Sequence, residues 1–159
     1  MWQKQQQMTR HVSLCVALLF FLVTVLPPET VFGLETSQIQ KGAAQGDMND
    51  AYLLGVMYRT GAGVAPDCFE ALKWTRQAAM QGHALAQSHL GMLYKNGCNE
   101  KVVREPSEAY LWTALAAKQG LNFAKENLIE LEALLHPYTI AEVNRKVEDF
   151  KPTKMNRAK

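Results

Sequence analysis

Patterns that bind metals or phosphates are missing from this chain of 159 residues. Only three cysteines occur (Cys15, Cys68 and Cys98), and no two of them form the closely spaced pair typical of a structural zinc site. The four histidines are never four residues apart, and no glycine-rich loop of the Walker or dinucleotide type is present. We therefore expect no metal and no cofactor.

A strong excess of charge of one sign is also missing. Lys and Arg number 17 against 15 Asp and Glu, which leaves a formal net charge of +2. Proteins that bind nucleic acids non-specifically need a basic surface, so we expect no nucleic-acid partner. Apolar residues make up 48% of the chain and charged residues 20%, a balance typical of a globular protein with a core.

The N-terminal segment has the three parts of a secretory signal peptide. The first eleven residues contain Lys4 and Arg10 but no acid, and residues 12–26 (VSLCVALLFFLVTVL) are almost wholly apolar. Residues 31–33 (VFG) then end on a small residue of the kind that a signal peptidase recognises. A membrane-spanning helix needs about 20 apolar residues, which makes an uncleaved membrane tether the alternative rather than our prediction.

The rest of the chain repeats itself. Residues 54–58 (LGVMY) recur 36 positions later as residues 90–94 (LGMLY), and Trp74 recurs 38 positions later as Trp112. The difference of two predicts a two-residue insertion, which we place in residues 99–104. Self-similarity at a fixed period indicates a repeat array, in which each unit buries its apolar face only against its neighbours.

Each repeat has the pattern of two helices. In the first repeat, Leu54 and Gly55 lie on the inward face of a helix, where the missing side chain of Gly55 leaves room for a neighbouring helix. Gly61 ends this helix, Asp67 caps the start of the second helix, and Gly82 ends it.

The aromatic and histidine side chains of the array have a structural interpretation. Trp74 and Trp112 recur at equivalent inward positions, so we interpret them as core residues rather than as a pair that stacks on a ligand. Neither His83 nor His89 belongs to a pattern that supplies an orienting carboxylate and a nucleophile. We therefore predict no catalytic residue.

These features resemble the Sel1-like repeat, a relative of the tetratricopeptide repeat. The resemblance rests on residues 51–82 (AYLLGVMYRTGAGVAPDCFEALKWTRQAAMQG) and on a second copy that contains QSHLGMLYKNG and EPSEAYLWTALAAKQG. It implies an all-α fold, a short right-handed α-solenoid of helix pairs. A helix after Pro137 resembles the closing helix of bacterial arrays, with His136 where that family usually has Thr or Ser.

The resemblance also suggests how the chain is divided. We expect a signal peptide, a repeat domain and a basic flexible tail, over residues 1–33, 34–150 and 151–159. Within the repeat domain we expect full repeats at about 47–82 and 83–120, with a half repeat at each end.

Solenoids of this kind usually act as interaction scaffolds. The resemblance therefore implies an exported, non-catalytic adaptor of the bacterial envelope, periplasmic or secreted, that binds a protein or peptide and does not stay inserted in the membrane after signal cleavage. One alternative is an enzyme or binder that acts on penicillin-like compounds, as has been linked to cysteine-rich relatives with a Cys pair in each repeat. A membrane-tethered adaptor is the other alternative.

In helical-pair solenoids, the first helix of each unit lines the concave side. The predicted binding face is the side of these helices opposite the Leu-Gly-x-x-Tyr positions. Its residues are Asn49, Tyr52, Val56 and Arg59 in the first repeat, Leu85, Ser88, Met92 and Lys95 in the second, and Phe123, Glu126 and Glu130 in the last half repeat. The alternative is that Val56, Leu85 and Met92 pack between neighbouring first helices.

Cys68 and Cys98 are candidates for a disulfide. Stacked repeats bring their inter-helix loops to one edge, and an oxidising compartment permits the bond. Adjacent units lie about 10 Å apart, however, and a disulfide requires Cα atoms within about 7 Å. Two unpaired cysteines therefore remain the alternative.

The N-terminal pattern predicts where the mature chain begins. When the full sequence is expressed in a bacterial host, the recovered protein should begin near Leu34 and stay in solution without detergent, because cleavage removes the apolar run. N-terminal sequencing and intact mass would measure this. Recovery of the full-length chain only in washed membranes would contradict it.

Overall fold

The computed structural model describes the backbone of residues 28–98 and 103–153, with side chains from residue 35 onward. The chain divides into two units, residues 1–35 and 36–159, and the second contains the repeats. The described ranges form seven helices and no strand: α2 (Pro28–Ala44), α3 (Met48–Thr60), α4 (Cys68–Met80), α5 (Ala84–Asn96), α6 (Pro106–Lys118), α7 (Asn122–Glu132) and α8 (Pro137–Asp149). No helix in this part of the chain is long and apolar enough to cross a membrane.

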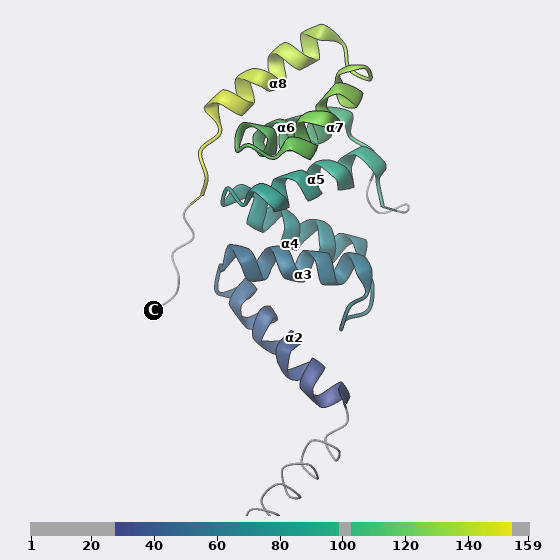
Figure 1. The fold of residues 1–159 in the computed structure, drawn as a ribbon, viewed down its shortest axis with the longest axis vertical. Coiled ribbons are helices and arrows are strands. Elements are labelled where there is room, and N and C mark those ends of the chain that lie inside the picture. Colours follow the sequence, from purple (N-terminus) through teal and green to yellow (C-terminus); the bar gives the residue numbers. More distant parts are fainter. Residues whose placement is uncertain (1–27, 99–102, 154–159) are drawn as a thin grey trace, which may run out of the picture. The chain divides into compact units, whose positions relative to one another are not determined.

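The helices of the second unit pack in chain order (Figure 1). α3 packs against α4 and α5 against α6, which are the two helix pairs of the repeats. Contacts between α4 and α5 and between α6 and α7 join successive pairs, and α8 packs on α6. Each pair therefore buries its apolar face against the next pair, and the predicted all-α solenoid of helix pairs is confirmed.

One glycine allows the two helices of each pair to lie close together. A Cβ atom on Gly55 would collide with the hydroxyl of Thr75 on α4 and would lie 2.9 Å from its backbone nitrogen. In the second pair, a Cβ atom on Gly91 would meet the hydroxyl of Thr113 and lie 3.2 Å from its backbone nitrogen. The prediction that Gly55 leaves room for a neighbouring helix is confirmed, and the same contact recurs in the second repeat.

A backbone hydrogen bond recurs in the loop inside each pair. The N–H of Asp67 donates to the carbonyl oxygen of Tyr58, and the N–H of Glu105 donates to that of Tyr94, both at 2.9 Å. The partners are nine residues apart in the first loop and eleven apart in the second. The two-residue insertion therefore lies in the second loop, although residues 99–102 are outside the described residues.

A second turn recurs between the repeats. Gly82 and Gly120 end α4 and α6 with φ angles of 90° and 94°, a left-handed conformation that favours glycine. The residue after each glycine, His83 or Leu121, donates its N–H to the carbonyl oxygen five residues earlier, at 3.2 and 3.3 Å. These residues are also the N-caps of α5 and α7, so each turn leads directly into the next helix.

The recurring tryptophans pack as predicted, and each also donates a hydrogen bond to a glutamate carboxylate. Trp112 is buried and Trp74 is half-buried against the core. Their Nε1 atoms donate to the carboxylates of Glu108 (3.0 Å) and Glu70 (2.8 Å), each four residues earlier. Because Glu70 turns toward Trp74, only half of a capping box forms at the start of α4, where Asp67 accepts from the N–H of Glu70 at 3.2 Å.

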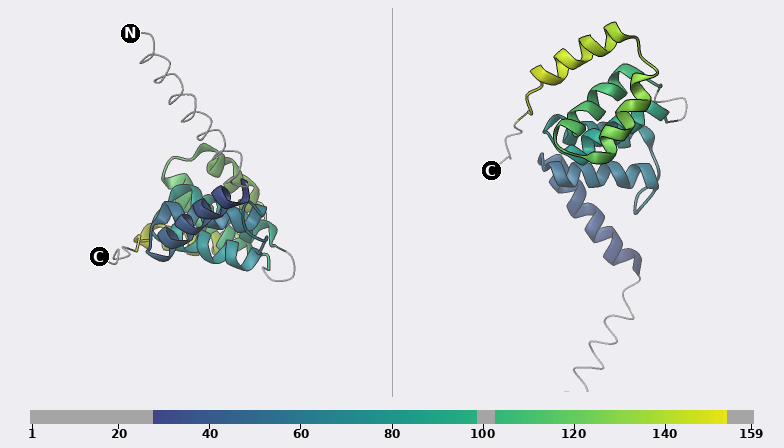
Figure 2. Two further views of the ribbon diagram at one scale, coloured as in Figure 1. Left: turned by 90° about the horizontal axis from the view of Figure 1, so that it is seen from below. Right: turned by 45° about the horizontal axis from the view of Figure 1, so that its top comes forward.

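The segment after α8 runs back along one end of the stacked helices (Figures 1 and 2). The ring of Phe150 meets Trp112 edge-on, with centroids 6.0 Å apart. The N–H and the hydroxyl of Thr153 both donate, at 2.9 Å, to the carbonyl oxygen of Met80 in the last turn of α4. Residues 151–153, expected in a flexible tail, are instead held in place because they satisfy a helix-end carbonyl. Residues 154–159 lie outside the described residues.

Cys68 and Cys98 form a disulfide in the structure, with Cα atoms 5.9 Å apart. Cys68 begins α4, and Cys98 follows the end of α5. Successive helices joined by a tight turn run antiparallel, so the start of α4 lies beside the end of α5. This local pairing brings the Cα atoms nearer than the spacing between repeats suggested.

The disulfide generates a stability prediction. Reduction should lower the free energy of unfolding of residues 34–159 by about 3.5 kcal/mol, because the bond closes a loop across 30 residues. Urea unfolding with and without a reductant measures the difference, and a Cys68→Ala variant should show no response to reductant. Two reactive thiols in the unfolded, non-reduced protein would show that the bond does not form.

The close approach of the helices at Gly55 generates a second stability prediction. Gly55→Ala should lower the free energy of unfolding by roughly 2 kcal/mol, because the added methyl group forces α3 away from α4. Asn49→Ala, on the exposed side of the same helix, is the control and should change stability by less than about 0.5 kcal/mol. Equal urea midpoints for the two variants would contradict the prediction.

Candidate functional site

The predicted binding face lies on α3, α5 and α7, the first helices of their units. Its exposed residues are Asn49, Arg59, Leu85, Phe123, Glu126 and Glu130. Its half-buried residues are Tyr52, Val56, Met92 and Lys95. The structure brings two of these residues together across helices, since the ammonium of Lys95 on α5 pairs with the carboxylate of Glu130 on α7.

The prediction that Ser88 belongs to the binding face is wrong. Its side chain is only 1% exposed, so it is not available to a partner. α5 packs against both α4 and α6, and a short side chain in the middle of such a helix is covered by its surroundings. Within the described structure, the Ser88 hydroxyl has no hydrogen-bond partner.

An aromatic cluster joins α3 to α5 on this face. The ring of Tyr52 stacks on His83, with centroids 4.7 Å apart and planes at 26°. Tyr52 also lies against His89, with centroids 5.3 Å apart and planes at 50°. The Nδ1 atom of His83 accepts the N–H of Ala86 at 3.1 Å as the N-cap of α5, which fixes its ring.

The two histidines were not among the predicted face residues. The period of the repeat relates Tyr52 to Ser88 and says nothing about which side chains lie between two first helices. The contact of Tyr52 with His83 and His89 crosses from one repeat to the next, and no local pattern in the sequence reports it.

Burial and one positive charge set the protonation of the cluster. Burial lowers the pKa of His83 and His89, and the Arg59 guanidinium lowers the pKa of His89 further. Burial raises the pKa of the Tyr52 phenol, an effect that Arg59 partly opposes. The two imidazoles therefore favour their neutral forms and Tyr52 keeps its proton, so Arg59 supplies the positive charge of the group.

These four side chains suit binding better than catalysis. The guanidinium, the phenol and a neutral imidazole can all donate hydrogen bonds. General-base catalysis by a histidine typically needs a carboxylate to orient the ring, and no hydrogen bond of either imidazole to a carboxylate is found within the described residues. That part of the chain also has no group of three or more His, Cys, Asp or Glu side chains that could hold a metal ion.

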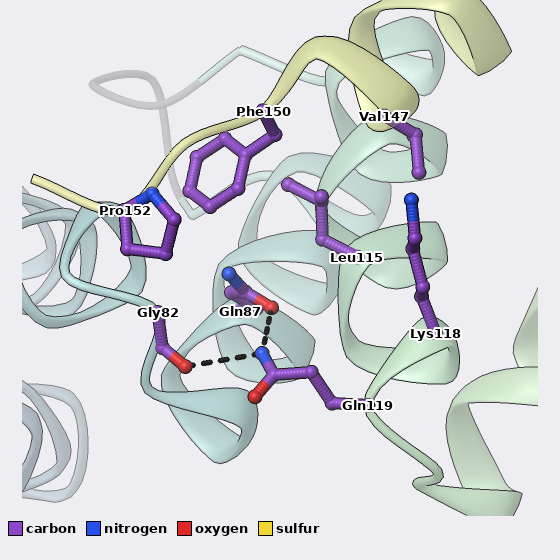
Figure 3. Close-up of a pocket in the computed structure, with 8 residues that line it drawn as sticks. All are labelled: Gly82, Gln87, Leu115, Lys118, Gln119, Val147, Phe150 and Pro152. Carbon is purple, nitrogen blue, oxygen red and sulfur yellow. Dashed lines mark hydrogen bonds between the residues drawn. The ribbon is translucent and has the colours of Figure 1, made fainter.

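A cavity of about 230 Å³ lies between the ends of the helices and the C-terminal segment (Figure 3). It is lined by Gly82, Gln87, Leu115, Lys118, Gln119, Val147, Phe150 and Pro152. The side-chain amide of Gln119 donates to the carbonyl oxygen of Gly82 (3.0 Å) and to Gln87 (2.7 Å), so these polar groups already have partners. Pockets for small molecules typically measure about 300–1,000 Å³. The face on α3, α5 and α7 is therefore the better candidate site.

Comparison with known proteins supports the repeat assignment. The Sel1 repeat family matches residues 50–83 and 84–121. Among curated proteins, the chain is similar to chitin synthase regulatory factor 3 of Schizosaccharomyces pombe, with 38% identity over 107 residues. This match covers 65% of the chain and 11% of the yeast protein.

Two solved structures have a similar fold. One is a protective antigen present in uropathogenic Escherichia coli strains that displays an SLR fold, with a TM-score of 0.71 and 28% identity over 81% of this chain. The other is a Sel1 repeat protein from Oxalobacter formigenes, with a TM-score of 0.57 and 32% identity over 60% of this chain.

The chain spans only part of each of these proteins. The match covers about a tenth of the yeast protein, 27% of the antigen and 39% of the Oxalobacter protein. What the family model and the two solved structures share with this chain is the Sel1-like repeat. The chain belongs to the Sel1-like repeat family.

Proposed function

We propose that this protein is an exported, non-catalytic adaptor that binds a segment of a partner protein along α3, α5 and α7. The single observation that carries the proposal is the composition of this face in the structure. Aromatic, apolar and charged side chains from three successive first helices share it. Sel1-like repeat proteins are interaction modules, and helical-pair arrays present such surfaces to their partners.

Exposed apolar groups support binding on this face. Leu85 is 42% exposed and Phe123 is 44% exposed, at equivalent positions near the starts of α5 and α7. Arg59 on α3 and Glu126 on α7 add charges of opposite sign. Interfaces are commonly built from apolar and aromatic contacts with a surrounding polar rim, which is the mixture found here.

The name of the yeast relative describes a regulatory factor of chitin synthase. A regulatory factor acts on another protein, which is compatible with an adaptor role for the shared repeats. Export, to the periplasm or beyond the cell, is part of the proposal because the first 33 residues have the order of a signal peptide. The alternative of an enzyme for penicillin-like compounds comes from relatives with a Cys pair in each repeat, whereas this chain has only Cys15, Cys68 and Cys98.

Substitutions at the two exposed apolar residues test the proposal. Leu85→Ala combined with Phe123→Ala should weaken partner capture about tenfold, because apolar residues central to an interface often contribute more than 1 kcal/mol each. The melting temperature should fall only slightly, because both residues are exposed at the surface and neither belongs to the buried core. The measurement is quantitative mass spectrometry of envelope proteins captured on immobilised protein, together with a thermal melt.

A matched control removes an exposed aromatic residue elsewhere. Phe69 on α4 is 58% exposed and lies on a second helix of a pair, so Phe69→Ala should leave capture unchanged. Equal capture by the double variant, the Phe69 variant and the unaltered protein would show that this face does not bind the partner.

A further inference from the structure

Four side chains at the α3–α5 end of the binding face form a group that we name the Arg59 cluster: Tyr52, Arg59, His83 and His89. The ring of Tyr52 contacts both histidine rings, at centroid distances of 4.7 and 5.3 Å. Tyr52 and Arg59 are seven residues apart on α3 and therefore lie on one side of that helix. Arg59 is exposed and the other three are half-buried, so an exposed cation lies on the same side of α3 as the aromatic rings.

Among the described residues, no acid pairs with the positive charge of Arg59. Within the described residues Arg59 forms no ion pair, whereas Lys95, farther along the same face, is already paired with Glu130. α5 contains no Asp or Glu, and the one acid of α3 is Asp50. A Cβ atom on Gly42 of α2 would collide with the Asp50 carboxylate, so this acid points toward α2.

Charge is thus segregated along the binding face. The α3–α5 end carries Arg59 and hydrogen-bond donors, and the acids Glu126 and Glu130 lie on α7. A guanidinium can donate two parallel hydrogen bonds to a carboxylate, and such charge-assisted bonds are about twice as strong as neutral ones.

We propose that the Arg59 cluster recognises a carboxylate on the bound segment, with Arg59 as the paired cation and Tyr52 and His89 as additional donors. This inference rests on the proposed function, since it names the chemistry of the segment that the face binds. A single positive charge matches a carboxylate better than a doubly charged phosphate group. The carboxylate comes from an Asp or Glu side chain or from the C-terminus of the partner, and the two sources can be distinguished by experiment.

The test begins with defined peptides. A phage-displayed library of random 12-residue peptides, fused through their C-termini, is selected on residues 34–159 of the protein. Enriched peptides should share an Asp or Glu at one position. The peptides are then synthesised with an amidated C-terminus, and a Kd is measured by isothermal titration for the acidic peptide and for its Asn or Gln counterpart.

The role of Arg59 follows from a double-mutant comparison. Replacing the peptide acid by its amide should weaken binding at least tenfold with the unaltered protein and less than twofold with Arg59→Gln. Arg76→Gln, an exposed arginine on α4, is the control and should retain the full tenfold effect. Arg59→Lys keeps the charge without the planar fork and should give an intermediate effect. Far-UV circular dichroism and a thermal melt confirm that each variant is folded.

The outcomes separate this inference from the proposed function. Peptides that lose affinity with the Leu85 and Phe123 double variant but bind equally well as acid and amide would overturn the carboxylate role and leave the adaptor face intact. If no displayed peptide shows an acid preference, but free C-terminal peptides bind better than their amidated forms only when Arg59 is present, the carboxylate is the partner's C-terminus. Failure of both peptide sets to bind this face would overturn both proposals.

Discussion

The close approach of two helices within each repeat is the contact on which the rest of the structure depends. Gly55 and Gly91 let the first helix lie against the backbone of the second at Thr75 and Thr113. A larger side chain would push the pair apart and tilt every later helix, because each pair packs only on its neighbours. The alignment of α3, α5 and α7, and hence the proposed binding face, follows from this contact.

A short array needs additional links because it has few interfaces between repeats. The disulfide between Cys68 and Cys98 fastens one edge of α4 to α5. At the other end of α4, Thr153 returns from beyond α8 to hydrogen-bond Met80. These links join elements far apart in the sequence, which restricts the relative motion of the repeats. A steady spacing between first helices is what a surface for an extended partner segment requires.

The proposed binding face combines packed and exposed groups. Tyr52 packs against His83 and His89, so its ring loses little freedom when a partner binds, whereas Arg59 reaches solvent. Burial lowers the pKa of both histidines, and the charge of Arg59 lowers the pKa of His89 further, which favours neutral imidazoles that can donate without adding charge. The polarity from the basic α3–α5 end to the acidic α7 gives the face a direction, and such complementarity contributes to specificity more than to affinity.

The sequence by itself determined the repeat, the fold class and the helix ends, because glycine turns, caps and helical periodicity act over a few residues. It also indicated that Gly55 makes a close contact and that Trp112 is buried. Only the tertiary structure decided that Ser88 is covered, that Tyr52 contacts two histidines of the next repeat, and that residues 151–153 return to α4. These features depend on distances between helices, and the repeat period does not specify which side chains of neighbouring units meet.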